Sequence, residues 1–296
     1  MTSALVPPPP LPLPAADPGR LRSLAHVALD MDGTIYKGGT LFPCTRPFLA
    51  LLRELGIGYS FLTNNPSKST ADYVAHLRRL GVPATPEELH TTVRATIDAL
   101  RHRHPAARRL FILGTPSMLA EFAAAGFTLA DEQSPEAPDA VVVGFDLTLS
   151  YPRLCRACWW IQQAGIPYLA TNPDHICPTD QPTVLVDCGS ICAMIATATG
   201  RAPDLVLGKP DPAMLDGILA RNGLRPEQVA MVGDRLYTDI RMARRARAMG
   251  VLVLTGEATA ADAVAAEPGC RADLVVPSLA EFGELLAQAR RRPAAG

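Results

Sequence analysis

Short apolar runs that stop abruptly at polar residues recur along this chain, and they constrain its fold more than any other feature. Four of them end in the stretches around Asp30, Thr63, Lys209 and Asp234. An apolar run of strand length bounded by a turn signal predicts a buried parallel strand. These runs alternate with helical repeats such as 45–55. The sequence therefore predicts an α/β fold with a doubly wound, mainly parallel sheet, whose strand ends bring these polar groups to one edge.

The first of these stretches places two carboxyl groups directly after a strand. Asp30 and Asp32 are separated by one residue, so an extended backbone puts both side chains on one side, and Gly33 lets the chain turn at once. Two converging carboxylates are costly unless a cation such as Mg²⁺ lies between them or one of them holds a proton. An aspartate-rich turn after a core strand is the alternative interpretation.

The order of the predicted elements divides the chain into parts. Residues 1–22 form a Pro-rich leader that cannot bury a core, so we expect it to be disordered. The α/β pattern restarts at about residue 105 and returns near residue 202. This predicts a main α/β unit, 23–105 with 202–288, that is interrupted by a second α/β unit, 106–201.

Composition argues against several functional classes. The 296 residues carry a net charge of -1, which offers no electrostatic footprint for nucleic acid. No apolar run approaches the roughly 20 residues of a membrane helix, and the N-terminus has no signal-like segment, so we expect a cytoplasmic protein. Seven cysteines in such a chain favour free thiols. The pairs Cys155/Cys158 and Cys188/Cys192 fit either a zinc site or small core side chains.

The polar groups at the strand ends form a set that suits phosphoryl transfer. This reaction needs a nucleophile, a metal ion, a cation for the phosphate oxygens and hydrogen-bond donors. Four carboxylates, one lysine, one Mg²⁺ and a phosphate dianion sum to a charge of about -3, which favours one protonated carboxylic acid. Asp32 is the candidate for this proton, because it could donate it to the leaving oxygen.

Four stretches resemble, in order, the four motifs of the haloacid dehalogenase-like (HAD) phosphatases: DMDGT, FLTNN, GKPDP and GDRLYTDI. They are most similar to the branch of NagD-type sugar or nucleotide phosphatases, 4-nitrophenylphosphatases, and pyridoxal and phosphoglycolate phosphatases. The resemblance covers about residues 25–285. It implies a HAD-like Rossmannoid core, with an inserted α/β cap domain between the second and third motifs.

The resemblance also implies a role for each site residue. Asp30 corresponds to the nucleophile that forms an aspartyl-phosphate, and Asp32 to the general acid and base. The residues implied in phosphate binding are Thr63, Asn64, Asn65 and Lys209. Mg²⁺ would be bound by Asp30, Asp234 and the main-chain carbonyl of Asp32, and Asp239 would orient the surroundings of the metal. Asp174 and His175 would contact the substrate from the cap. Thr63 could instead be only a turn residue, Asp239 a helix N-cap and His175 a solvent-facing side chain.

The resemblance implies a Mg²⁺-dependent phosphatase that acts on a small phosphorylated metabolite and that can form a homodimer through the cap. A sugar phosphate or a nucleoside monophosphate is the expected substrate, with pyridoxal phosphate or phosphoglycolate as alternatives. A carbon-halogen or phosphonate hydrolase on the same fold is a rival function, but a dehalogenase needs no acid at the position of Asp32. A non-catalytic phosphate-binding protein is the third hypothesis, and it would be expected to have lost catalytic residues that this chain retains.

Overall fold

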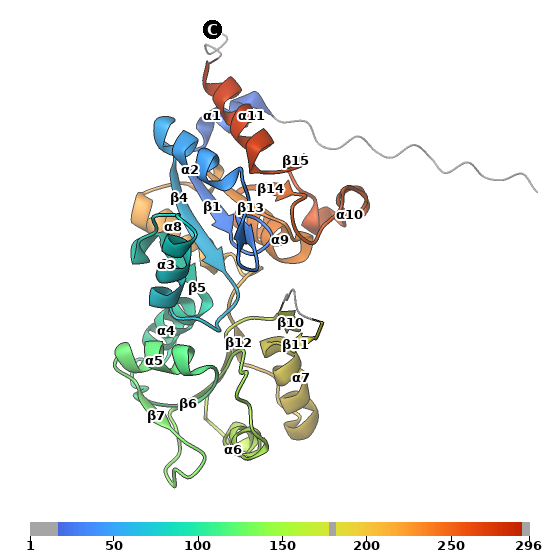
Figure 1. Cartoon of the computed structure of the whole chain (residues 1–296). Helices are drawn as coiled ribbons and strands as arrows, with labels where there is room; N and C mark the ends of the chain where they lie inside the picture. The colour runs from blue at the N-terminus through green and yellow to red at the C-terminus, as the bar shows by residue number, and fades with distance from the viewer. Residues whose placement is uncertain (1–16, 178–181, 292–296) are drawn as a thin grey trace, which may run out of the picture.

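The computed structural model describes residues 17–177 and 182–291, and it contains two parallel sheets that each carry helices on both faces (Figure 1). The main sheet has six strands in the order β15-β14-β13-β1-β4-β5. These are β1 (His26–Asp30), β4 (Gly58–Thr63), β5 (Leu89–Thr91), β13 (Val229–Gly233), β14 (Met249–Val253) and β15 (Leu274–Val276). The predicted doubly wound, mainly parallel α/β fold is confirmed.

Helices cover both faces of the main sheet because successive strand residues point to opposite sides. Val27 and Leu29 of β1 pack into one apolar cluster, whereas Ala28 between them packs into another. The first cluster includes side chains from α1 (Pro18–Ser23), α2 (Thr45–Glu54), α3 (Thr70–Arg79) and α11 (Leu279–Arg291), and the second from α8 (Ala213–Asn222) and α9 (Arg241–Ala246). The short helix α10 (Ala260–Ala265) packs near the edge, beside Leu252.

The second sheet has five parallel strands in the order β12-β9-β8-β6-β7. These are β6 (Arg109–Leu113), β7 (Thr128–Ala130), β8 (Ala140–Val143), β9 (Tyr168–Ala170) and β12 (Leu205–Val206). One face packs against α4 (Thr92–Arg103) and α5 (Pro116–Ala124), and the other against α6 (Tyr151–Gln162) and α7 (Cys188–Thr199). Cys188 and Cys192 lie buried on α7, as expected for small core side chains, whereas Cys158 on α6 is half-buried and Cys155 is exposed, so the core interpretation is wrong for Cys155. All seven cysteines are thiols.

Two elements that we expected in the main unit belong to the second sheet. β12 pairs in parallel with β9, so the expectation that Lys209 follows a strand of the main sheet is wrong. α4 packs its side chains Val93 and Ile97 against the strands of the second sheet. A short apolar run does not encode which sheet it joins, because pairing is a long-range choice. The domain limits at 105/106 and 201/202 stay a prediction. The positions of α4 and β12 favour limits nearer residues 91 and 208, where the chain passes from one sheet to the other.

The expected disorder of residues 1–22 is wrong for its last part. Asp17 caps α1 by accepting a hydrogen bond from Gly19 N at 2.8 Å. Leu21 is only 2% exposed and packs in the main apolar cluster together with residues of α11. An apolar side chain in a short helix is enough to fix this segment on the core. Residues 1–16, on which the rest of that prediction falls, lie outside the described residues.

The strand register determines which polar groups come together. Asp30 at the end of β1 pairs with Leu62 of β4, and Leu29 pairs with Val232 of β13. The stretches after β4 and β13 therefore flank Asp30 on its two sides. Two antiparallel ribbons, β2 (Tyr36–Lys37) with β3 (Thr40–Leu41) and β10 (Ile176–Cys177) with β11 (Leu185–Val186), complete this region. Figure 1 shows the β10–β11 ribbon at the end of the second unit that faces the main sheet.

Four short helical segments lie between the regular elements. They are η1 (Pro86–Glu88), η2 (Pro226–Gln228), η4 (Pro268–Cys270) and the π-helical η3 (Leu236–Ile240). η3 directly follows the end of β13, and it buries Asp239 completely. Within the described ranges, no helix combines the length and the apolar character that crossing a membrane requires.

Candidate active site

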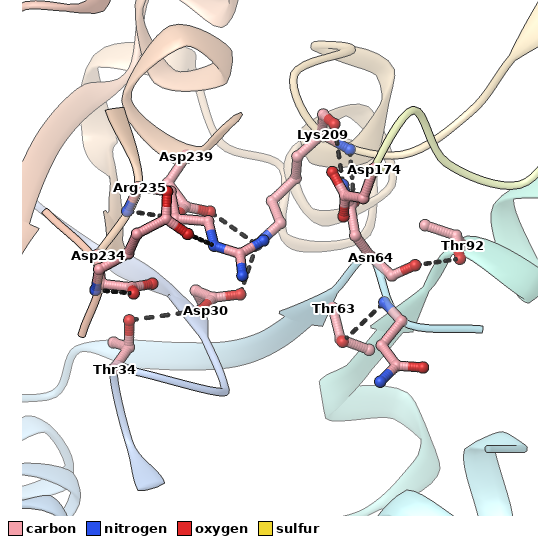
Figure 2. A network of polar contacts seen from close by, with 12 residues as sticks. Asp30, Thr34, Thr63, Asn64, Thr92, Asp174, Lys209, Asp234, Arg235 and Asp239 are labelled. Atoms are coloured by element: carbon pink, nitrogen blue, oxygen red, sulfur yellow. Dashed lines mark hydrogen bonds and ion pairs between the residues drawn. The ribbon is translucent and has the colours of Figure 1, made fainter. Parts of the chain in front are cut away.

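Three buried carboxyl groups meet beyond the ends of β1 and β13 (Figure 2). One oxygen from each of Asp30, Asp234 and Asp239 lies within 4.8 Å of the others. Burying three acids so close together is costly unless positive charge compensates them or some of them hold a proton. The sequence prediction that Asp30, Asp234 and Asp239 belong to one site therefore agrees with their positions.

The carboxyl group of Asp234 has the features of a cation ligand. Its Oδ2 accepts a hydrogen bond from Glu257 N at 2.7 Å, whereas its buried Oδ1 has no hydrogen-bond partner. Burial raises the pKa of Asp234 to about 8, and the neighbouring charges of Asp30 and Asp239 contribute to this shift. A divalent cation would reverse the effects of burial and of these like charges, so it would displace the proton that Asp234 holds at neutral pH.

Two glycines form the walls around the same carboxyl group. A Cβ atom at Gly33 would lie 2.4 Å from Asp234 Oδ2, and one at Gly256 would lie 2.0 Å from it. Gly33 also has a φ of +90°, which disfavours other residues. The chain thus keeps side chains away from Asp234. Hard oxygen donors around an orphaned carboxylate oxygen are the ligand set that Mg²⁺ prefers, so the residues present fit this ion.

The ammonium group of Lys209 places a positive charge directly against two of these carboxyl groups. Lys209 is only 3% exposed, and its Nζ donates to Asp239 Oδ1 at 2.7 Å and to Asp30 Oδ1. Burial alone would lower the pKa of Lys209, but the charges of Asp239 and Asp30 outweigh it and hold that pKa above its ordinary value. Lys209 is therefore charged at neutral pH, and it lies where it can neutralise both Asp30 and a phosphoryl group.

The side chain of Asn64 is bound to the main chain of Lys209. Its Oδ1 accepts from Lys209 N at 2.7 Å, and its Nδ2 donates to Lys209 O at 2.9 Å and to Asp174 Oδ2 at 3.1 Å. These bonds use both hydrogens of the amide. In this structure the donor hydrogens of the Asn64 side chain are therefore committed to other protein groups. Phosphate binding by Asn64 stays a prediction.

Thr63 and Asn65 lie in the same loop and line the same cavity as Asp30. Thr63 Oγ1 accepts from Asn65 N at 3.1 Å, which is a local turn contact. The side chain of Asn65 accepts from Ser67 N at 2.9 Å and donates to Cys177 Sγ at 3.4 Å. The turn interpretation of Thr63 thus agrees with the structure, and phosphate binding by Thr63 and Asn65 stays a prediction.

Asp32 lies at the rim of the cavity, and its side chain keeps contact with solvent. The surrounding protein partly desolvates the carboxyl group and raises its pKa, and the nearby charge of Asp30 raises it further. An acid with a raised pKa, placed beside the nucleophile candidate, suits proton donation and acceptance. Asp30 is buried whereas Asp32 is exposed, and the separation of roles that the sequence predicts for them stays a prediction.

The cavity over Asp30 has a volume of about 50 Å³ and is lined in part by residues of the second unit. Asp174 lines it, and Asp174 Oδ1 is buried without a hydrogen-bond partner. His175 does not line it: its ring is exposed, with Nδ1 3.5 Å from Ser190 Oγ. Of the two expected cap contacts, Asp174 faces the site, whereas His175 is the solvent-facing side chain of the alternative interpretation.

Sequence reasoning missed four residues that line this cavity: Cys177, Asp187, Arg235 and Thr238. Asp187 caps α7 through a hydrogen bond from Cys188 N at 2.6 Å. Burial raises its pKa to about 6. The guanidinium of Arg235 lies 2.9 Å from Glu257 Oε2 through its Nε. Two signals in the sequence could have indicated these residues: Asp187 directly precedes a helical repeat, and Arg235 directly follows Asp234.

Comparisons with known proteins agree with this geometry. Family models described as haloacid dehalogenase-like hydrolase and HAD-hydrolase-like match residues 27–128 and 206–282. The human glycerol-3-phosphate phosphatase is 35% identical over 265 residues, which cover 82% of each chain. The crystal structure of a 4-nitrophenylphosphatase from Thermotoga maritima has a TM-score of 0.83 and 40% identity, and the match covers 90% of this chain and 98% of that one.

A glycerol phosphate phosphatase from Mycobacterium tuberculosis, solved in complex with magnesium, has a TM-score of 0.80 and 34% identity, covering 90% of this chain and 77% of that one. The chain belongs to the haloacid dehalogenase-like hydrolases, a family of enzymes. Within this family it lies in the NagD and 4-nitrophenylphosphatase-like branch, as the four motifs predicted.

Proposed function

We propose that this chain is a Mg²⁺-dependent phosphatase of small phosphate monoesters, and that it works through an aspartyl-phosphate on Asp30. The carboxylate of Asp30 attacks the phosphorus atom, the bond to the alcohol oxygen breaks, and Asp32 gives its proton to that oxygen. Water then attacks the aspartyl-phosphate while Asp32 takes a proton from it, which releases phosphate and restores Asp30. The observation that carries this proposal is the single buried cluster in which Lys209 bonds Asp30 beside Asp234.

The residues that would hold Mg²⁺ are Asp30, Asp234 and the main-chain carbonyl of Asp32. When bound, the ion supplies positive charge that offsets the developing charge on the phosphoryl oxygens. Asp239 stays behind them and orients the site, since its oxygens accept from Lys209 Nζ at 2.7 Å and from Arg235 N at 3.1 Å. The orphaned Oδ1 of Asp234 supports this assignment.

The substrate class that the cavity favours is a phosphorylated alcohol with further hydroxyl groups, such as glycerol phosphate or a sugar phosphate. Asp174 and Asp187 of the second unit line the cavity together with Asp30, and the unpartnered Asp174 Oδ1 suits a hydroxyl donor. A second carboxylate, as in phosphoglycolate, would meet two like-charged groups there. Arg235 is already paired with Glu257. The relatives of this chain include glycerol-3-phosphate phosphatases from human and Mycobacterium tuberculosis, which supports this choice.

The test is a phosphate-release assay on glycerol 3-phosphate, phosphoglycolate, pyridoxal phosphate and 4-nitrophenyl phosphate, with Mg²⁺ and with EDTA. We expect hydrolysis only with Mg²⁺, with glycerol 3-phosphate preferred over phosphoglycolate. Asp30→Asn should lower kcat by about 10³-fold or more while the chain still folds. Asp131→Asn, on an exposed carboxyl group of the second unit, is the matched control. Full activity of Asp30→Asn would contradict the proposal. Self-association through the second unit stays a prediction, which gel filtration tests.

A further inference from the structure

We propose that Asn64 is a positioning residue that couples the docking of Asp174 to the placement of the Lys209 ammonium. This inference rests on the proposed function, in which Lys209 neutralises the phosphoryl group. It concerns a separate question, namely how the second sheet is held in position relative to the main sheet during the reaction.

The site is divided between two sheets. Asp30 ends β1 of the main sheet, but Lys209 follows β12 and Asp174 follows β9, which are neighbouring strands of the second sheet. The position of the ammonium against Asp30 therefore depends on how the second sheet sits over the main one. A shift of 1 Å in such a group can cost about 100-fold in rate.

Besides the carboxyl groups of Asp30 and Asp239, the side chain of Asn64 binds the second unit at this point. Asn64 directly follows β4, and its amide makes two bonds to the main chain of Lys209, at 2.7 and 2.9 Å. A Cβ atom at Gly208 would lie 2.8 Å from Asn64 Oδ1, and Gly208 has a φ of +81°. The glycine before Lys209 thus leaves room for the amide group of Asn64, whose bonds to Lys209 are drawn in Figure 2.

The third bond of the amide runs to Asp174. Asn64 Nδ2 donates one hydrogen to Lys209 O and the other to Asp174 Oδ2 at 3.1 Å, so Asp174 adds a third restraint to the amide that holds the main chain of Lys209. Movement of Asp174 away from the site removes this restraint from the group that holds Lys209. Lys209 is therefore fully positioned only while Asp174 is bonded to Asn64. When the site opens to solvent and this bond is lost, the ammonium group of Lys209 is less well placed for the reaction.

The test uses 4-nitrophenyl phosphate, whose leaving group has no hydroxyl for Asp174 to contact, and inorganic vanadate as a phosphoryl mimic. Asp174→Ala should lower kcat and weaken vanadate inhibition by about 10-fold, within the usual range of coupling between sites. Asp174→Asn should recover most of the activity that Asp174→Ala loses, because an amide oxygen can still accept from Asn64. Asp131→Ala and Asn222→Ala, away from the cavity, are the matched controls, and thermal unfolding checks the fold of each variant.

The deciding measurement is a double-mutant cycle with Asn64→Asp. This variant keeps an acceptor for Lys209 N but loses both donor hydrogens and places a carboxylate against Asp174. Adding Asp174→Ala should then leave kcat unchanged or raise it, whereas the same change costs about 10-fold with Asn64 present. Equal losses in both backgrounds, or no loss in either, would overturn the coupling. A wild-type chain that hydrolyses none of the phosphate esters would refute the proposed function itself, and this inference with it.

Discussion

The ammonium nitrogen of Lys209 lies 2.7 Å from Oδ1 of Asp239, in a pair where the lysine side chain is 4% exposed and the aspartate side chain is not exposed at all. Lys209 comes from the loop after the second sheet, and Asp239 from the π-helical turn after β13 of the main sheet. This buried ion pair therefore ties the two units together at the same point where Asp30 is held.

Replacing Lys209 by methionine should abolish activity and destabilise the protein. The change leaves Asp30 and Asp239 buried without their cation, which costs about 3 kcal/mol of unfolding free energy at pH 8. The loss should be smaller at pH 5, because burial, opposed by Lys209, already raises the pKa of Asp239 to about 6. Urea unfolding at both pH values measures this, with the exposed Lys37→Met as control. An equal loss at both pH values would contradict it.

Mg²⁺ should bind more tightly as the pH rises toward 8. Burial and the charges of Asp30 and Asp239 raise the pKa of Asp234 to about 8 without the ion, so below that pH the ion must displace a proton. The affinity for Mg²⁺ should increase about tenfold or more between pH 6.5 and 8.5, with proton release on binding. Titration calorimetry in two buffers measures both quantities. Asp234→Asn should remove the rise in Tm that Mg²⁺ causes, and an affinity independent of pH would argue against Asp234 as ligand.

Replacing Asp32 by asparagine should affect substrates according to their leaving group. Glycerol 3-phosphate needs a proton on its leaving oxygen, so kcat should fall by about 10²-fold to 10⁴-fold. With 4-nitrophenyl phosphate the first step needs no acid, but the water that attacks the aspartyl-phosphate loses its base. A stoichiometric burst of 4-nitrophenolate followed by slow turnover is therefore expected in rapid-mixing experiments. Equal losses on both substrates without a burst would count against the role of Asp32.

Asp187→Asn should stabilise the protein above pH 6. Burial raises the pKa of Asp187 from 3.8 to about 6, so the stability associated with its proton is present below pH 3.8 and is lost as the pH rises through 6. Asparagine keeps the oxygen that caps α7 but carries no charge. The gain in unfolding free energy should grow from near zero at pH 4 to at most about 3 kcal/mol at pH 8. Urea unfolding across this range tests it, and a gain that is constant with pH would refute the cause.

The sequence alone determined the strands and the turns that end them. The apolar run 26–29 before Asp30 and the run 229–232 before Asp234 are local patterns, and a buried strand followed by a sharp turn needs only neighbouring residues to be recognised. The four motifs in order likewise identified the family and the group of acids around Lys209. The short strand β5 and the helix α1 were missed, because three or six residues carry too little periodicity.

Only the tertiary structure decided which sheet carries each group and what each side chain contacts. It assigned Lys209 to the second sheet, gave the amide of Asn64 to the main chain of Lys209, and brought Asp187 and Arg235 to the cavity. The strand partners and buried charge pairs are distant in the sequence: Lys209 pairs with Asp239, which lies 30 positions away, and with Asp30, which lies 179 positions away. Their energies depend on packing and desolvation, which no local pattern of residues records.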